Sequence, residues 1–220
     1  MQQREHLVEI PAGKIRLEGN LALPPGAKGI VLFAHGSGSG RHSPRNRYVA
    51  QVLQDTGIAT LLFDLLTEQE EAQDRVTGHL RFNIPLLAER VSAATAWATH
   101  DELTKRLRIG YFGASTGAAA ALVAAAERDD IAAIVSRGGR PDLAEEALER
   151  VTTPTLLIVG GYDAQVIELN QAAMRQMRAV RRLRAEVELK IVPRASHLFE
   201  EPGKLEEVAR LAAEWFGKHL

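Results

Sequence analysis

The sequence predicts an α/β fold: a mostly parallel sheet of about seven or eight strands with helices on both faces. Apolar runs alternate with helical stretches along the whole chain, and several runs are apolar at every position, as in strands buried on both sides. No internal repeat or low-complexity linker divides the 220 residues. We therefore expect one domain over residues 1–220, with no stretch long enough for a separate lid domain.

The first two expected strands, 7–10 and 15–23, form an antiparallel edge pair around the turn Pro11-Ala12-Gly13. Each later strand is a short aliphatic run that leads into a polar or glycine-rich loop. These later strands cover residues 29–34, 58–63, 131–135, 155–159 and 187–192, with a further one starting at 108. Because parallel strands need crossover connections, the helices between them should cover the sheet.

The expected helices follow from caps and apolar spacing. Ser43 and Pro44 supply the N-cap and first-turn proline of a helix that stops at Gly57. The segment from Leu65 to Gly78 is acidic and lacks strand character, and we interpret it as an exposed loop with a short helical turn. Further helices are expected over 82–100, 118–126, 143–150 and 167–182, with a last one whose apolar stripe runs from Leu205 to Phe216.

The composition narrows the classes of function. Lys and Arg number 27 against 28 Asp and Glu, so no overall charge attracts nucleic acid or an anionic membrane. The absence of cysteine excludes disulfides, zinc–thiolate sites and a cysteine nucleophile. The first residues lack the apolar core of a signal peptide, and the longest apolar run, Ala118–Ala126, is too short to span a bilayer. We expect a soluble, cytoplasmic protein.

One stretch carries a chemical motif. Gly113-Ala114-Ser115-Thr116-Gly117 is a Gly-x-Ser-x-Gly frame between a predicted strand and an alanine-rich helix. In a nucleophile elbow the serine adopts a strained backbone conformation that lifts its hydroxyl above the sheet, and glycine is required where neighbouring chains leave no room for a side chain. The N-terminus of the following helix directs N–H groups at the place where an oxyanion would form. Ser115 is therefore the candidate nucleophile.

Ser115, Asp163 and His197 each follow a predicted strand, at the edge where open α/β sheets place their sites. An imidazole activates a serine hydroxyl by taking its proton, and a carboxylate fixes the tautomer of the imidazole. Asp142 and Glu168 are rival acids, and Asp163 could instead cap the following helix. His197 is one of seven histidines, and its place after the last strand makes it the best candidate base.

The chain resembles the α/β hydrolases, and most closely their small dienelactone-hydrolase-like branch. The matching motifs are His35-Gly36-Ser37-Gly38, the elbow at 113–117, Gly161-Tyr162-Asp163-Ala164-Gln165-Val166 and Ser196-His197-Leu198-Phe199. The resemblance implies the α/β-hydrolase fold, a triad of Ser115, Asp163 and His197, and an oxyanion hole made by the N–H groups of Ser37 and Thr116. Dienelactone hydrolases proper use a cysteine nucleophile, so the serine at 115 favours a general serine esterase.

Other polar residues near the predicted site allow two interpretations. Arg41, Arg137 and Arg140 either bind a carboxylate or phosphate of the substrate or are surface charges paired with the acidic segment. His35 is expected to be structural, with bonds inside its own loop. That loop could be a flexible turn, and it lacks the Gly-Lys-Ser/Thr of a phosphate-binding loop. No histidine–carboxylate spacing indicates a metal site.

The predicted function is hydrolysis of carboxylic esters, or of related lactones or thioesters, through an acyl-enzyme intermediate and without a cofactor. The expected partner is a small-molecule ester, with no nucleic acid and no membrane. A hydrolase-shaped binding or regulatory module with little turnover is the alternative from another class, because fold alone does not fix function.

Overall fold

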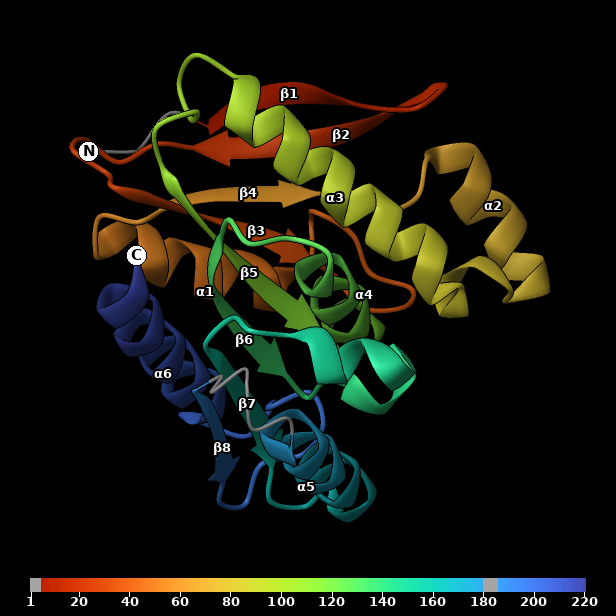
Figure 1. Ribbon diagram of the computed structural model, residues 1–220, viewed down its shortest axis with the longest axis vertical. Helices are drawn as coiled ribbons and strands as arrows, with labels where there is room; N and C mark the ends of the chain where they lie inside the picture. The colour runs from red at the N-terminus through yellow and green to blue at the C-terminus, as the bar shows by residue number, and fades with distance from the viewer. Residues whose placement is uncertain (1–4, 180–185) are drawn as a thin grey trace.

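The computed structural model describes residues 5–179 and 186–220. Within these ranges eight strands form one sheet in the order β1-β2-β4-β3-β5-β6-β7-β8 (Figure 1). They are β1 (Glu5–Ala12), β2 (Ile15–Ala22), β3 (Gly29–Ala34), β4 (Ala59–Phe63), β5 (Arg108–Ala114), β6 (Ile131–Arg137), β7 (Thr155–Gly160) and β8 (Val187–Val192). The β1–β2 and β2–β4 pairs are antiparallel, and the other pairs are parallel. The predicted fold class is confirmed.

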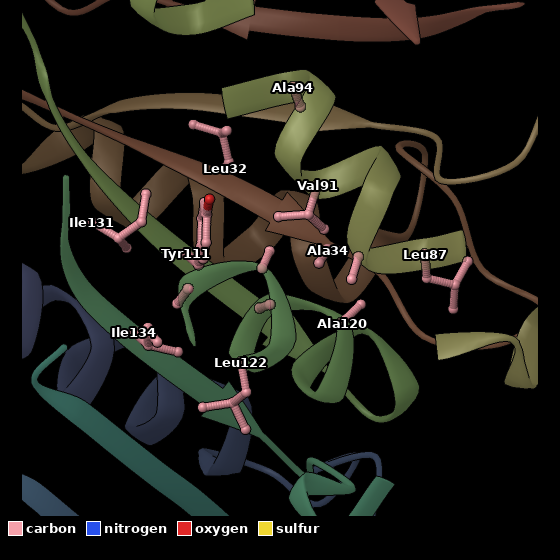
Figure 2. Packing of buried hydrophobic residues seen from close by; sticks show 14 of the residues in the cluster. Leu32, Ala34, Leu87, Val91, Ala94, Tyr111, Ala120, Leu122, Ile131 and Ile134 are labelled. Atoms are coloured by element: carbon pink, nitrogen blue, oxygen red, sulfur yellow. The ribbon is translucent and has the colours of Figure 1, made fainter. Parts of the chain in front are cut away.

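Helices cover both faces of this sheet (Figure 1). One face carries α1 (Pro44–Asp55) and α6 (Lys204–His219), and the other carries α3 (Ile84–His100), α4 (Thr116–Ala126) and α5 (Ala164–Ala179). Successive residues of a strand point to opposite faces, so neighbours in sequence enter different core layers. Leu32 and Tyr111 pack with α3 and α4 (Figure 2), whereas Phe33 and Phe112 pack with α1 and α6, their ring centroids 4.9 Å apart.

The helix that follows the elbow is enclosed by the fold. α4 packs between α3 and the 3₁₀ segment η2 (Pro141–Arg150), and its alanines up to Ala125 are buried. Figure 2 shows Ala120 of this helix near Leu87 and Val91 of α3, whereas Leu122 points away from α3. Alanine suits the position because a small side chain lets the helix approach the sheet and both neighbours closely. The N-terminus of α4 is thereby fixed at the sheet edge.

The acidic segment after β4 is a helix, and its prediction as a loop was wrong. α2 (Glu68–Thr77) begins with a capping box: the Thr67 hydroxyl accepts from the Glu70 N–H at 3.2 Å, and the Glu70 carboxylate accepts from the Thr67 N–H at 2.8 Å. Acidic side chains in its first turn are stabilised by the positive end of the helix dipole. Gly78 ends the helix in the left-handed conformation, with φ of 67°.

Other boundaries differ by a few residues. The helix expected from 82 begins at Ile84, after the 3₁₀ turn η1 (Leu80–Phe82), because the Asn83 side chain caps it by accepting from the Leu86 N–H. The helix expected over 143–150 is the 3₁₀ segment η2, which is interrupted at Glu145 with φ of 48°. The last residues of the helix expected over 167–182 lie outside the described ranges. No helix within those ranges has the length and apolarity needed to cross a membrane.

Candidate active site

The elbow has the backbone strain that its sequence predicts. Ser115 lies between β5 and α4 with φ of 51° and ψ of −122°, a conformation that non-glycine residues rarely adopt. A Cβ at Gly117 would overlap the carbonyl oxygens of Ala34 and His35, and one at Gly113 would overlap the backbone of Ala118. These clashes are with main chain and cannot be relieved by a rotamer change. The two glycines therefore allow the close packing that holds the turn.

Hydrogen bonds fix the serine backbone against neighbouring segments. The Ser115 N–H donates to the Arg137 carbonyl at 3.3 Å, and the Ser115 carbonyl accepts from the N–H groups of Ala118 and Arg140, each at 3.1 Å. On the other side, a Cβ added to Gly36 would lie 3.0 Å from the Ser115 Cβ. The strained residue is thus held between the end of β6 and the loop after β3.

Asp163 and His197 meet through their side chains. Asp163 follows β7, His197 follows β8, and the His197 Nδ1 lies 2.6 Å from the Asp163 Oδ2. The imidazole packs against Gly138, where an added Cβ would lie 3.4 Å from its Cε1. Arg137, whose carbonyl accepts from the Ser115 N–H, directly precedes Gly138, so the Ser115 backbone and the His197 imidazole contact adjacent residues at the end of β6. A carboxylate on Nδ1 leaves Nε2 as the nitrogen that can accept a proton.

A second carboxylate holds the loop that carries His197. Both carboxylate oxygens of Glu201 accept from the Ser196 N–H, at 3.0 and 2.9 Å. This hydrogen bond to the charged form is the largest cause that lowers the pKa of Glu201. Phe199 lies between them in the chain, buried and with φ of 57°. Glu201 was not predicted from the sequence, because an acid four residues after a histidine matches no motif.

The two residues expected to form the oxyanion hole are neighbours. The Ser37 hydroxyl lies 3.1 Å from the Thr116 hydroxyl, and it also donates to the Arg81 carbonyl at 3.4 Å. Thr116 is the first residue of α4, so its N–H has no acceptor within the helix. The Ser37 N–H has no backbone or side-chain acceptor among residues 5–179 and 186–220. Both N–H groups are therefore free to donate within the described part of the chain, and the oxyanion hole stays a prediction.

His35 ties the loop after β3, which carries Ser37, to the segment before α2. Its Nε2 accepts from the Leu65 N–H at 2.9 Å, so its Nδ1 carries the proton and donates to the Gly36 carbonyl at 3.0 Å. Burial lowers the pKa of His35 and outweighs the opposing effects of the Gly36 carbonyl and of Asp64 and Glu71. The side chain is thus a neutral crosslink. The bond to Leu65 extends beyond the loop in which the sequence placed its contacts.

The rival acids lie elsewhere. Asp142 accepts two hydrogen bonds from the Arg140 guanidinium, at 2.9 and 2.7 Å, and Glu168 is exposed on α5. Arg41 is also paired: it contacts the carboxylates of Glu18 and Asp64, and its Nε donates to the Asn20 side chain at 3.1 Å. Since the guanidinium groups of Arg41 and Arg140 are occupied within the protein, these contacts favour the structural interpretation of both.

Arg137 has different surroundings. It is buried at the end of β6, and its guanidinium has no carboxylate partner in the part of the chain that the structure describes. Its Nη1 is fully enclosed without a hydrogen-bond acceptor. Burial and the nearby Arg45 cation lower the pKa of Arg137 to about 10. Of the three arginines considered as substrate ligands, Arg137 is the one whose charge is not neutralised within the described ranges.

Comparison with known proteins gives matches over nearly the whole chain. The model of the dienelactone hydrolase family matches residues 17–218. Two curated relatives, from two strains of Mycobacterium tuberculosis and provisionally named phosphoribosyl transferases, are 55% identical over 218 residues. The match covers 99% of this chain and 47% of each relative. The chain therefore spans about half the length of the curated relatives it matches.

Solved structures give a similar result. A dienelactone hydrolase from Anabaena variabilis is 59% identical and superposes with a TM-score of 0.95, covering 100% of both chains. An esterase from Pyrococcus furiosus is 20% identical with a TM-score of 0.79, covering 99% of this chain and 92% of its own. At that lower identity the likeness shows the fold alone.

Proposed function

The chain belongs to the dienelactone hydrolase family, and from this premise we propose that it is a serine hydrolase that cleaves carboxylic esters through an acyl-enzyme intermediate. Membership of this family supports a hydrolytic activity for the chain. The observation that supports the finer proposal is the 2.6 Å contact between the His197 imidazole and the Asp163 carboxylate. This imidazole packs on Gly138, next to the residue that binds the backbone of the strained Ser115. Lactones and thioesters share the acyl chemistry and are related candidate substrates.

In the proposed first step, the Ser115 Oγ attacks the carbonyl carbon of the ester while the His197 Nε2 takes the hydroxyl proton. Asp163 keeps the Nδ1–H tautomer and stabilises the imidazolium that forms. The tetrahedral intermediate then collapses: the bond to the alcohol oxygen breaks, and His197 returns the proton to that oxygen. The alcohol leaves, and the acyl group remains on Ser115.

The second half of the reaction repeats these roles with water as the nucleophile. His197 takes a proton from water, the hydroxide attacks the acyl carbon, and Ser115 leaves with the proton from His197. In both halves the oxyanion accepts from the N–H groups of Ser37 and Thr116, and one such donor is commonly worth about 3 kcal/mol. The products are a carboxylic acid and an alcohol, and no cofactor takes part in this proposed sequence.

Recognition of an acidic substrate is the less supported part of the proposal. Arg41 and Arg140 have their own carboxylate partners, so Arg137 is the remaining candidate. Its enclosed, un-neutralised guanidinium would bind an anionic group more strongly than an exposed one. Replacing Arg137 with Gln should then narrow the difference in kcat/KM between a matched acidic and a neutral ester. A parent enzyme that treats both esters equally would remove Arg137 from the substrate site.

The provisional name of the curated relatives describes a different activity. The match covers 47% of each relative, so the other half of those proteins lies outside it. We propose that the transferase name belongs to that half and that the shared half is the hydrolase. This chain alone should then show no phosphoribosyl transfer. A cytoplasmic location and the absence of nucleic-acid or membrane partners stay predictions.

Turnover of an activated ester, such as p-nitrophenyl acetate, tests the proposed function against a binding module. The parent should hydrolyse the ester, with an initial burst of nitrophenol when deacylation is slower than acylation and the acyl-enzyme accumulates. Ser115→Ala should abolish turnover, while Ser39→Ala, a serine of the neighbouring loop, should retain it. Hydrolysis that is equal in the parent and in Ser115→Ala would support the binding-module alternative instead.

A further inference from the structure

A cavity lies beside the loop after β3 and under α2. It has a volume of about 360 Å³, within the range of small-molecule sites. Ser37 and Thr116 line it on one side, and Leu65, Leu66 and Leu87 form its apolar part. Leu87 belongs to the first turns of α3 (Figure 2), whereas the other two leucines lie in the loop that leads into α2.

The position of the cavity relative to the triad decides which part of an ester can enter it. Its lining includes the two proposed oxyanion donors, but none of Ser115, Asp163 and His197. In an acyl transfer the alcohol oxygen must receive its proton from His197, so the alcohol lies on the His197 side of the carbonyl. The acyl chain is the remaining substituent of the carbonyl carbon, and the cavity is on the side left for it.

The charges around the cavity neutralise one another. Asp74 is almost fully buried and accepts from the Arg81 Nε at 2.6 Å and from the Leu80 N–H at 2.7 Å. At the rim, Glu71 pairs with Arg75 at 3.5 Å. His35 is neutral, so the charged side chains of the lining sum to zero: two acids against two arginines. No surplus charge is present to offset the desolvation of an ionised acyl group.

We propose that this cavity binds the acyl part of the substrate and selects neutral, largely apolar acyl groups. The proposal rests on the proposed esterase function and adds the substrate class. The leucines supply the apolar contact, and α2 forms the outer wall of the cavity. Each methylene that the cavity encloses should raise kcat/KM by up to roughly fourfold. An acidic group on the alcohol side would be a separate matter, since that side faces away from the cavity.

Two ester series test the assignment. The first keeps p-nitrophenol and varies the acyl group from acetyl through butyryl to hexanoyl, and the second keeps acetyl and varies the size of the alcohol. Leu66→Trp fills the cavity and should lower the hexanoyl-to-acetyl ratio of kcat/KM by at least about tenfold, while the alcohol series keeps its order. Leu198→Trp, at a leucine beside His197, should alter the alcohol series and leave the acyl ratio unchanged.

A third variant and one charged ester complete the design. If Leu66→Trp does not fold, Leu66→Ala enlarges the cavity and should raise the hexanoyl-to-acetyl ratio instead. The kcat/KM for the p-nitrophenyl ester of pentanoic acid should exceed that for the p-nitrophenyl monoester of glutaric acid by at least about tenfold. The two acyl groups have the same chain length, and only the second ends in a carboxylate.

The outcomes separate this inference from the function on which it rests. An alcohol series that responds to Leu66→Trp would place the alcohol in the cavity and overturn the assignment. If neither Leu66 variant changes the hexanoyl-to-acetyl ratio of kcat/KM, the cavity does not bind substrate. Ser115-dependent hydrolysis of the acetyl ester would still stand in that case. Hydrolysis that survives Ser115→Ala would instead remove the function itself.

Discussion

The Ser115 side and the His197 side of the candidate site are held in place by different forces. Around Ser115 the contacts are steric: main chain packs on main chain, and glycines occur where a Cβ would overlap a carbonyl. Around His197 the contacts are polar: Asp163 holds the imidazole, and Glu201 holds the Ser196 N–H. The first side should therefore tolerate no added atom, whereas the second should respond to changes of charge that preserve shape.

This difference also separates stability from activity. Close packing at the elbow is part of the core, because Ala114, Thr116 and the alanines of α4 are buried with it. The His197 loop lies at the surface, and the His197 side chain is 40% exposed. Damage to the first side should reduce folding stability, and damage to the second should reduce turnover in a folded protein.

Gly117→Ala should have the largest effect on folding stability. Its new Cβ would overlap the carbonyl oxygens of Ala34 and His35, and because main chain cannot move aside, the free energy of unfolding should fall by at least about 3 kcal/mol. Urea denaturation measures the change. Gly217→Ala is the matched control, since it adds a Cβ in open space on α6 and should stabilise by roughly 0.5–1 kcal/mol. Parent-like stability of Gly117→Ala would refute the steric account of the elbow.

Asp163→Asn should leave folding nearly intact and reduce turnover strongly. The amide cannot hold the Nδ1–H tautomer of His197, and the loss of kcat should be on the order of 10⁴, as for the equivalent change in a serine protease. Asp142→Asn is the control, because this acid binds Arg140 rather than the imidazole. Steady-state kinetics of both variants decide the matter. A large loss in the control and a small one in Asp163→Asn would move the acid to the end of β6.

Glu201→Gln should have a smaller effect of the same kind. The amide keeps one acceptor for the Ser196 N–H but loses the charge, so His197 should be less well positioned. We expect a loss of kcat below the roughly 10²-fold that a 1 Å displacement can cause, with little change in KM or in the unfolding midpoint. Glu200→Gln, an exposed neighbour, should behave as the parent. A loss of stability without any loss of kcat would show that Glu201 serves the fold alone.

The smallest effect is a pH dependence of stability from His35. Because burial lowers its pKa in the folded protein, the unfolded chain binds more protons once the pH falls below the ordinary value of 6.5. The free energy of unfolding therefore keeps its full value above pH 6.5. Below that pH it decreases by at most about 1.4 kcal/mol per pH unit, until the folded-state pKa is reached. His35→Gln keeps an acceptor for Leu65 and does not titrate. Between pH 7 and 5 the free energy of unfolding should fall more steeply with decreasing pH in the parent than in His35→Gln. Equal slopes would contradict this role of His35.

Much of the fold and the triad candidates could be predicted from the sequence because their signals are local. Buried parallel strands are continuous apolar runs, and the Gly113–Gly117 frame has few alternatives between a strand and a helix. α2 was missed although its capping box is written in the sequence, Thr67 followed three residues later by Glu70. Its acidic, exposed composition dominated the interpretation, and a helix with little apolar periodicity gives no other signal.

The partners of the charged residues could not be predicted, since they depend on contacts distant in sequence. Arg41 meets Glu18 of β2 and Asp64, which directly follows β4, and no local spacing reveals these contacts. The same holds for the bond between His35 and Leu65, which the fold creates by placing the ends of β3 and β4 side by side. The sequence indicates which residues carry chemistry. Tertiary contacts decide which of them are already occupied.

Covalent labelling with a fluorophosphonate tests the central claim most directly, because the reagent reacts with an activated serine and with few others. Intact mass should show one adduct per chain, and peptide mapping should place it on Ser115. Labelling should be absent in Ser115→Ala and should fall sharply in His197→Ala, where the proton acceptor is missing. Undiminished labelling in Ser115→Ala would contradict the assignment of Ser115 as the nucleophile.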